Sequence, residues 1–202
     1  FVNKAIIELA LLKASEKEGE GALDVFWNEV DQLRDLFKFE FFYAPTEEFH
    51  RQIRDELDRY DKNWETLLGQ GPAGFGLMLN SMTPLVAHVT LLTYAEAYSV
   101  VASLLAGMES NESLDEKACI DQALKFGRQA YLQRRISSES SIGKLLFKNA
   151  YKMLESRKLT DYSDPDVAEN RMELARELRD LLRRLDLIRA IGVASRSATL
   201  ER

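Results

Sequence analysis

The residues best suited to chemistry in this sequence are its two histidines and the carboxylates near them. His50 is followed five positions later by Asp55, a His-x4-Asp spacing. A histidine can take a proton from a hydroxyl group while an aspartate holds its ring in place, as in acyl transfer. Both residues, however, fall in a strongly amphipathic helical pattern, where positions five apart point about 140° away from each other. We therefore interpret His50 and Asp55 as a coincidental match and expect no catalytic residue in this segment.

Other chemical patterns are absent from the sequence. His88 lies in an apolar run without a second ligand at metal-binding spacing, so we interpret it as a core histidine. There is no paired Cys, His-x3-His, Asp-rich calcium loop or Gly-x-Ser-x-Gly, and Gly69 to Gly76 lacks the spacing of a phosphate-binding loop. We expect no metal site and no cofactor. Cys119 is the single cysteine, which excludes an internal disulfide, and we expect it to be buried and inert.

Charge is distributed unevenly along the chain. The net charge of the 202 residues is -6, which argues against nucleic-acid binding, because such binding depends on Lys and Arg neutralising phosphates. From Lys125 to Lys158, however, nine basic residues accompany two acids. This segment could be a solvated face, or it could face lipid headgroups, a coenzyme A phosphate or an acidic partner. The candidate anion-facing residues are Arg134, Arg135, Lys144, Lys148 and Lys152.

The most apolar part of the chain runs from Thr66 to Met108 and contains one acid, Glu96, and no Lys or Arg. Within it, Pro84 to Gly107 is apolar on nearly every side of a helix, which indicates a helix buried by neighbouring elements. A membrane span is the alternative, but polar residues interrupt the run and an acid in mid-helix is costly in lipid. We expect Glu96 to be buried and paired with Arg128, which follows a glycine that would let two helices approach.

Periodicity predicts a mainly α protein of about seven helices around this buried helix. One or two short strands are expected, at Phe37 to Tyr43, where aromatic residues alternate, and more weakly at Phe75 to Leu79. The last predicted helix ends at Gly192. We divide the chain into an N-terminal helical segment with the aromatic strand (1–70), a helical core domain (71–192) and a tail (193–202), with one continuous domain as the alternative. Because the chain begins with Phe1, we expect it to be a piece of a longer protein.

Several segments, taken in order, resemble the C-terminal region of bacterial glycerol-3-phosphate 1-O-acyltransferases. The resemblance covers most of residues 1 to about 190 and is densest from 94 to 158. It rests on Asn3-Lys-Ala5, Leu36-Phe-Lys-Phe-Glu-Phe-Phe-Tyr43, Tyr94-Ala-Glu-Ala-Tyr-Ser-Val-Val-Ala102, Gly127-Arg-Gln-Ala-Tyr-Leu-Gln-Arg-Arg-Ile136 and Ser138-Glu-Ser-Ser-Ile-Gly-Lys-Leu-Leu-Phe-Lys-Asn-Ala150.

The resemblance implies a parent enzyme that transfers a fatty acyl group from acyl-CoA or acyl carrier protein to sn-glycerol 3-phosphate, giving lysophosphatidic acid for phospholipid synthesis. It also implies that the catalytic residues lie in an N-terminal acyltransferase domain, that this segment is a non-catalytic helical domain packed on it, and that the protein is peripheral at the cytoplasmic face of the cell membrane. The anionic membrane surface would then be a further partner. The alternatives are a free-standing all-α partner-binding module and a helical transcriptional regulator.

Overall fold

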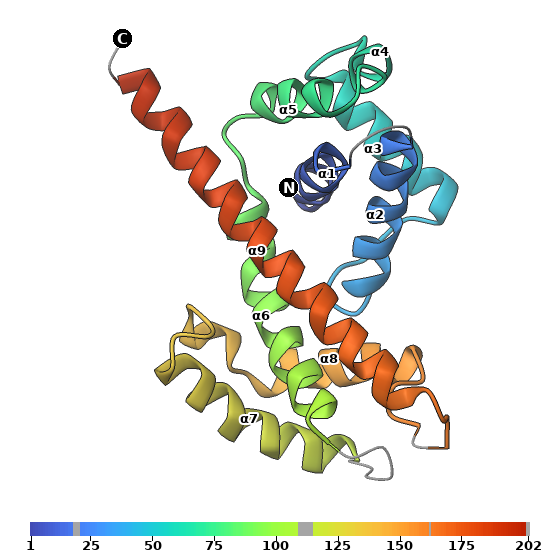
Figure 1. Cartoon of the computed structure of the whole chain (residues 1–202), viewed down its shortest axis with the longest axis vertical. Coiled ribbons are helices and arrows are strands. Elements are labelled where there is room, and N and C mark those ends of the chain that lie inside the picture. Colours follow the sequence, from blue (N-terminus) through green and yellow to red (C-terminus); the bar gives the residue numbers. More distant parts are fainter. Residues whose placement is uncertain (18–20, 109–114, 162, 201–202) are drawn as a thin grey trace. The chain divides into compact units, whose positions relative to one another are not determined.

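The computed structural model describes residues 1–17, 21–108, 115–161 and 163–200. In this part of the chain the regular elements are all helices, as Figure 1 shows. They are α1 (Val2–Ser15), α2 (Ala22–Leu36), α3 (Thr46–Asp58), α4 (Trp64–Leu68), α5 (Pro72–Ser81), α6 (Ala87–Ala106), α7 (Glu116–Leu132), the 3-10 helix η1 (Glu139–Ser141), α8 (Lys144–Ser156) and α9 (Val167–Leu200).

The mainly helical prediction is confirmed, but the predicted number of helices is too low. The apolar pattern that the sequence shows from residue 47 to residue 67 is divided between α3 and α4 by a turn. The weaker predicted strand at Phe75 to Leu79 lies inside α5. A short apolar run without clear periodicity does not distinguish a strand from a helix, which explains this error.

The described residues divide into two compact units. Unit 1 contains residues 1–36, 42–91 and those from 183 on, and unit 2 contains 37–41 and 92–182. This division differs from the predicted segments 1–70, 71–192 and 193–202. The two long helices α6 and α9 each contribute residues to both units, so no single cut along the sequence separates them.

In unit 1, α1 lies at the centre and packs against α2, α3 and α5 (Figure 1). Its residues are buried almost all round, because neighbouring helices cover more than one face. Two of the buried positions are charged, Lys4 and Glu8, and their side chains are 3.9 Å apart. Lys4 also donates hydrogen bonds to the Tyr60 hydroxyl and to the Met82 carbonyl. These partners satisfy a charge that would be costly to bury alone.

Glu8 satisfies the backbone at the start of α6. Its carboxylate accepts hydrogen bonds from the amide of Val86 at 2.9 Å and from that of Ala87 at 2.7 Å. The first amides of a helix have no partner within the helix, and a carboxylate there also interacts favourably with the helix dipole. The helix begins at Ala87 and not at Pro84 as predicted.

In unit 2, α7 and α8 pack closely at Gly127. A Cβ atom at this position would lie 3.3 Å from the Phe147 ring of α8 and 3.5 Å from Ile142. Phe147 and Ala150 of α8 are fully buried. A glycine therefore allows the two helices to approach each other, with a phenylalanine ring filling the space.

The predicted aromatic strand at Phe37 to Tyr43 is wrong. The chain turns here instead, with the amides of Glu40 and Phe41 both bonded to the Phe37 carbonyl. Phe37 lies 5.7 Å from the ring of Tyr98, and Phe41 lies 5.0 Å from that of Tyr94. Phe37 and Phe41, four residues apart in a tight turn, therefore both contact α6. The alternating aromatic residues pack on one helix without an extended chain.

The last helix continues past the predicted end at Gly192. It runs from Val167 to Leu200, because an isolated glycine lowers helix stability by roughly 1 kcal/mol without terminating the helix. In unit 1 it is held by Arg184, which is 3% exposed and lies 2.7 Å from Glu29 of α2. The predicted tail from 193 is therefore helical as far as Leu200.

Helix α6 is long and apolar enough to cross a membrane, judged by length and composition, and within the described residues it is the one helix that is. Half of the apolar stretch is buried inside the protein. A core helix passes the same test, and Leu91, Ala95 and Val101 are all fully buried or nearly so.

Candidate functional site

The two residues of the His-x4-Asp pattern do not face each other. His50 on α3 lies with Nε2 2.7 Å from Oδ1 of Asp31 on α2, and its ring is 5.0 Å from that of Trp27. Asp55 is exposed and lines a surface pocket together with Lys4 and Arg59, away from His50. The histidine is therefore oriented by a carboxylate other than the one that the spacing indicates.

Glu96 on α6 is 3% exposed and is surrounded by serine donors. Its Oε1 accepts hydrogen bonds from the Ser137 amide at 2.6 Å and the Ser137 hydroxyl at 2.7 Å, and its Oε2 accepts one from the Ser141 hydroxyl at 2.5 Å. The predicted partner was Arg128, which instead is exposed on α7. Short hydrogen bonds to a charged acceptor offset the cost of burying the carboxylate, so no arginine is needed.

These hydrogen bonds fasten the loop between α7 and η1 to α6. The loop begins at the end of α7, where the amide of Arg134 bonds to Tyr131 and the amide of Arg135 bonds to Ala130 at 2.8 Å. This is a Schellman motif, which places Arg134 in the left-handed region with φ 57°. The reversal directs Arg135 back over the Phe126 ring of α7, with its guanidinium carbon 5.0 Å from the ring centre.

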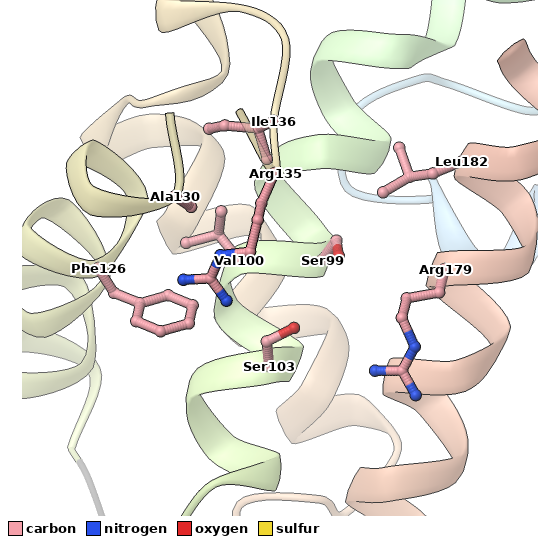
Figure 2. A pocket seen from close by; sticks show the side chains of 9 residues that line it. All are labelled: Ser99, Val100, Ser103, Phe126, Ala130, Arg135, Ile136, Arg179 and Leu182. Carbon is pink, nitrogen blue, oxygen red and sulfur yellow. The ribbon is translucent and has the colours of Figure 1, made fainter. Parts of the chain in front are cut away.

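A pocket of about 290 Å³ lies in unit 2 between this loop and the neighbouring parts of α6, α7 and α9. In Figure 2 the side chains of Arg135 and Arg179 lie on opposite sides of Ser103, and the Arg135 guanidinium is turned toward Phe126. Its lining residues are Ser99, Val100, Ser103, Phe126, Ala130, Arg135, Ile136, Arg179 and Leu182.

The pocket combines positive charge with apolar walls. Two arginines and two serine hydroxyls are its strong donors, and no carboxylate is among the lining residues. Within the described residues, neither Arg135 nor Arg179 forms a salt bridge. Guanidiniums and hydroxyls that line one pocket can bind an anion, and Val100, Ile136 and Leu182 could contact an apolar group attached to it.

The structure gives different surroundings to the five predicted anion-facing residues. Arg135 lines the pocket, whereas Arg134 is the exposed turn residue before it. Lys144 is exposed at the start of α8, and Lys148 and Lys152 are half-buried. Lys148 is 3.5 Å from Glu116 of α7. Of these five residues, Arg135 is therefore the one that the structure brings into a pocket.

The sequence did not indicate the other members of the pocket. Ser99 and Ser103 are one turn apart in a mostly apolar helix, and this spacing could have indicated a polar stripe. Arg179 carries no comparable signal, because α9 has charged residues along most of its length.

Cys119 is fully buried, and burial raises the pKa of its thiol to about 11. His88 is half-buried on α6.

Comparison with known proteins identifies the family. The sequence model of the glycerol-3-phosphate acyltransferase C-terminal region matches residues 1–163. The chain is also 34% identical over 191 residues to proteins named "Putative acyltransferase plsB1" in Mycobacterium bovis and Mycobacterium tuberculosis. This alignment covers 93% of the chain but 31% of each relative, so the chain spans about a third of their length. No solved structure matches the chain significantly.

The chain belongs to the C-terminal region of the glycerol-3-phosphate acyltransferase family, as its resemblance implied. A free-standing partner-binding module and a transcriptional regulator are not favoured.

Proposed function

We propose that this chain is a non-catalytic helical region of an enzyme that acylates sn-glycerol 3-phosphate. The parent protein would take a fatty acyl group from acyl-CoA or acyl carrier protein and form lysophosphatidic acid. The observation that carries the proposal is the family match over residues 1–163, combined with relatives about three times as long as this chain.

The surroundings of the acid and base candidates support a non-catalytic role. The carboxylate that orients His50 belongs to Asp31 and not to Asp55 of the His-x4-Asp pattern. The Glu96 carboxylate is enclosed by Ser137 and Ser141. A general base must lie within hydrogen-bonding reach of the proton that it removes, and a carboxylate already bonded to three donors is poorly placed for this. The catalytic groups would then belong to the N-terminal acyltransferase domain, which would be the first partner of this region.

An assay of product formation from acyl-CoA and glycerol 3-phosphate tests this proposal. The full-length parent should form lysophosphatidic acid, and the 202-residue chain alone should form none. In the parent, His50→Ala should cost less than about tenfold in turnover, whereas losing a catalytic base costs several orders of magnitude. Product from the isolated chain, or loss of turnover in a folded His50→Ala parent, would overturn the proposal.

We further propose that the parent is peripheral at the cytoplasmic face of the cell membrane and that basic residues of this chain contribute to its binding. The basic segment carries nine cations and two acids within an acidic chain, and each Lys or Arg near an anionic bilayer contributes roughly 1 kcal/mol. Lys144, with its neighbours Lys148 and Lys152 on α8, is the first candidate.

Charge reversal of these three lysines in the full-length protein should weaken its sedimentation with vesicles that contain phosphatidylglycerol. Vesicles of phosphatidylcholine alone should show no difference. Lys62→Glu changes an exposed lysine outside the segment and serves as the matched control. Unchanged binding after all three reversals would show that these lysines are only a solvated face.

A further inference from the structure

We propose that the pocket between α6, α7 and α9 in unit 2 binds a phosphate monoester that carries an apolar group. The proposal rests on the geometry of this chain and does not depend on the acyl transfer proposed for the parent. Its polar contacts would come from Arg135, Arg179, Ser99 and Ser103.

The donors fit phosphate better than carboxylate. A carboxylate has two oxygens, which one arginine can satisfy with two parallel hydrogen bonds. A phosphate monoester has three terminal oxygens and carries between one and two negative charges near pH 7. Two guanidiniums that line the same pocket, on either side of Ser103 in Figure 2, match the larger number of acceptors and the larger charge.

Within the described residues, no acidic side chain lines the pocket to balance its positive charge. The nearest acid along α6, Glu96, already accepts three hydrogen bonds from Ser137 and Ser141. Arg135 is stacked on Phe126, an arrangement that orients a guanidinium without neutralising it. An anion that enters the pocket would therefore meet one guanidinium that is already oriented, that of Arg135, and a lining in which the described residues supply no carboxylate.

The walls favour an apolar group on the ligand. Val100, Ala130, Ile136 and Leu182 present hydrocarbon next to the polar groups, and Ala130 and Ile136 are almost fully buried. The volume of about 290 Å³ suits a headgroup with a short chain and is too small to enclose a complete fatty acyl chain. Two sources share this chemistry, a small soluble phosphate monoester and the headgroup of an anionic lipid.

The experiment uses the 202-residue chain and hexyl phosphate as the probe. Amide chemical shifts in two-dimensional NMR should change saturably at Ser99, Ser103 and Arg135. Inorganic phosphate should bind at least about threefold more weakly, because it lacks the apolar group. Hexanoate and hexanol should bind more weakly still.

Substitutions test the two arginines. Arg135→Gln and Arg179→Gln should each lower the affinity for hexyl phosphate about tenfold or more, since each removes hydrogen bonds from a charged donor. Arg128→Gln on α7 and Arg176→Gln on α9 are matched controls, because both residues are exposed and neither lines the pocket. If a glutamine variant failed to fold, Arg179→Lys would replace it, with a smaller but measurable loss expected because lysine cannot bind in a bidentate manner.

Vesicles that contain phosphatidic acid distinguish the two sources. Binding of both hexyl phosphate and these vesicles, each weakened by Arg179→Gln, assigns a lipid headgroup. Binding of hexyl phosphate alone assigns a small soluble phosphate monoester. The proposal is overturned if no saturable binding occurs, if the arginine substitutions have no effect, if hexanoate binds as tightly as hexyl phosphate, or if inorganic phosphate does.

Discussion

The Ser141 hydroxyl donates a hydrogen bond of 2.5 Å to the Glu96 carboxylate, across 45 positions of the sequence. Ser141 is completely buried and lies in the short η1 helix. With the two hydrogen bonds from Ser137, this contact holds the loop that carries Arg135 against α6. The pocket therefore depends on a carboxylate that does not line it.

Replacing Glu96 with alanine should destabilise the protein by about 3 kcal/mol, because it leaves buried donors without an acceptor. Glu96→Gln keeps one acceptor oxygen and the volume of the side chain, and should cost about 1 kcal/mol. Unfolding in urea, followed by circular dichroism, measures both values. Equal stability of the alanine variant and the native protein would contradict this role, and under the phosphate proposal Glu96→Ala should also weaken hexyl phosphate binding.

The stability contribution of Glu8 should depend on pH. Burial raises the pKa of its carboxyl above the ordinary value of 4.5, although the Ala87 and Val86 amides and Lys4 act in the opposite direction. The folded state then holds this proton more tightly than the unfolded state does. The stability that this proton provides is fully present below pH 4.5 and is lost as the pH rises through the folded pKa.

The measurement is the difference in unfolding free energy between the native protein and Glu8→Gln over a series of pH values. The advantage of the native protein should decrease as the pH rises above 4.5 and then become constant. Groups common to both proteins cancel in the difference. An advantage that increases with pH would show that the hydrogen bonds to the charged form outweigh burial.

The Cys119 thiol should be unreactive in the folded protein. Burial raises its pKa to about 11, so at pH 8 very little thiolate forms, and the side chain is also inaccessible. Ellman's reagent should label the native chain slowly, whereas in denaturant it should label one thiol per chain at once. Rapid stoichiometric labelling without denaturant would be inconsistent with the buried position.

Two helix ends should gain stability from glycine. Arg134 after α7 and Lys158 after α8 both have positive φ, 57° and 59°, in Schellman motifs. A side chain in this region costs roughly 1 kcal/mol, which glycine avoids, so Arg134→Gly and Lys158→Gly should each stabilise by about 0.5 to 1 kcal/mol. Gln133→Gly is the control, because Gln133 has φ -83° and glycine there should be destabilising. Thermal unfolding distinguishes these outcomes.

Much of the helical structure was predictable because its apolar spacing is regular. Phe49, Ile53 and Leu57 recur at helical spacing, and all three are fully buried on α3. The strand predicted at Phe37 was wrong because a strand is not the only structure that places alternating aromatic residues against one neighbouring helix. A tight turn does so as well, since Phe37 and Phe41, four residues apart, both contact α6.

The candidate site was less predictable, for a different physical reason. The burial of Glu96 follows from its apolar surroundings, but its partners lie 41 and 45 residues away and are neutral serines. The charge of a buried carboxylate favours a cation as its partner, but several short hydrogen bonds from neutral donors also stabilise it. Arg179 joins the pocket through packing of α9, which local sequence does not encode.

The contact between Glu8 and the first amides of α6 sets a limit on how this region can be shortened. The donors and the acceptor are separated by 78 and 79 positions in the sequence, yet both belong to unit 1. A chain cut after Ser15 would lose the acceptor for Val86 and Ala87 together with the helix at the centre of that unit. In any division of the parent protein into separately expressed parts, the residues of α1 must therefore remain on the same piece as α6.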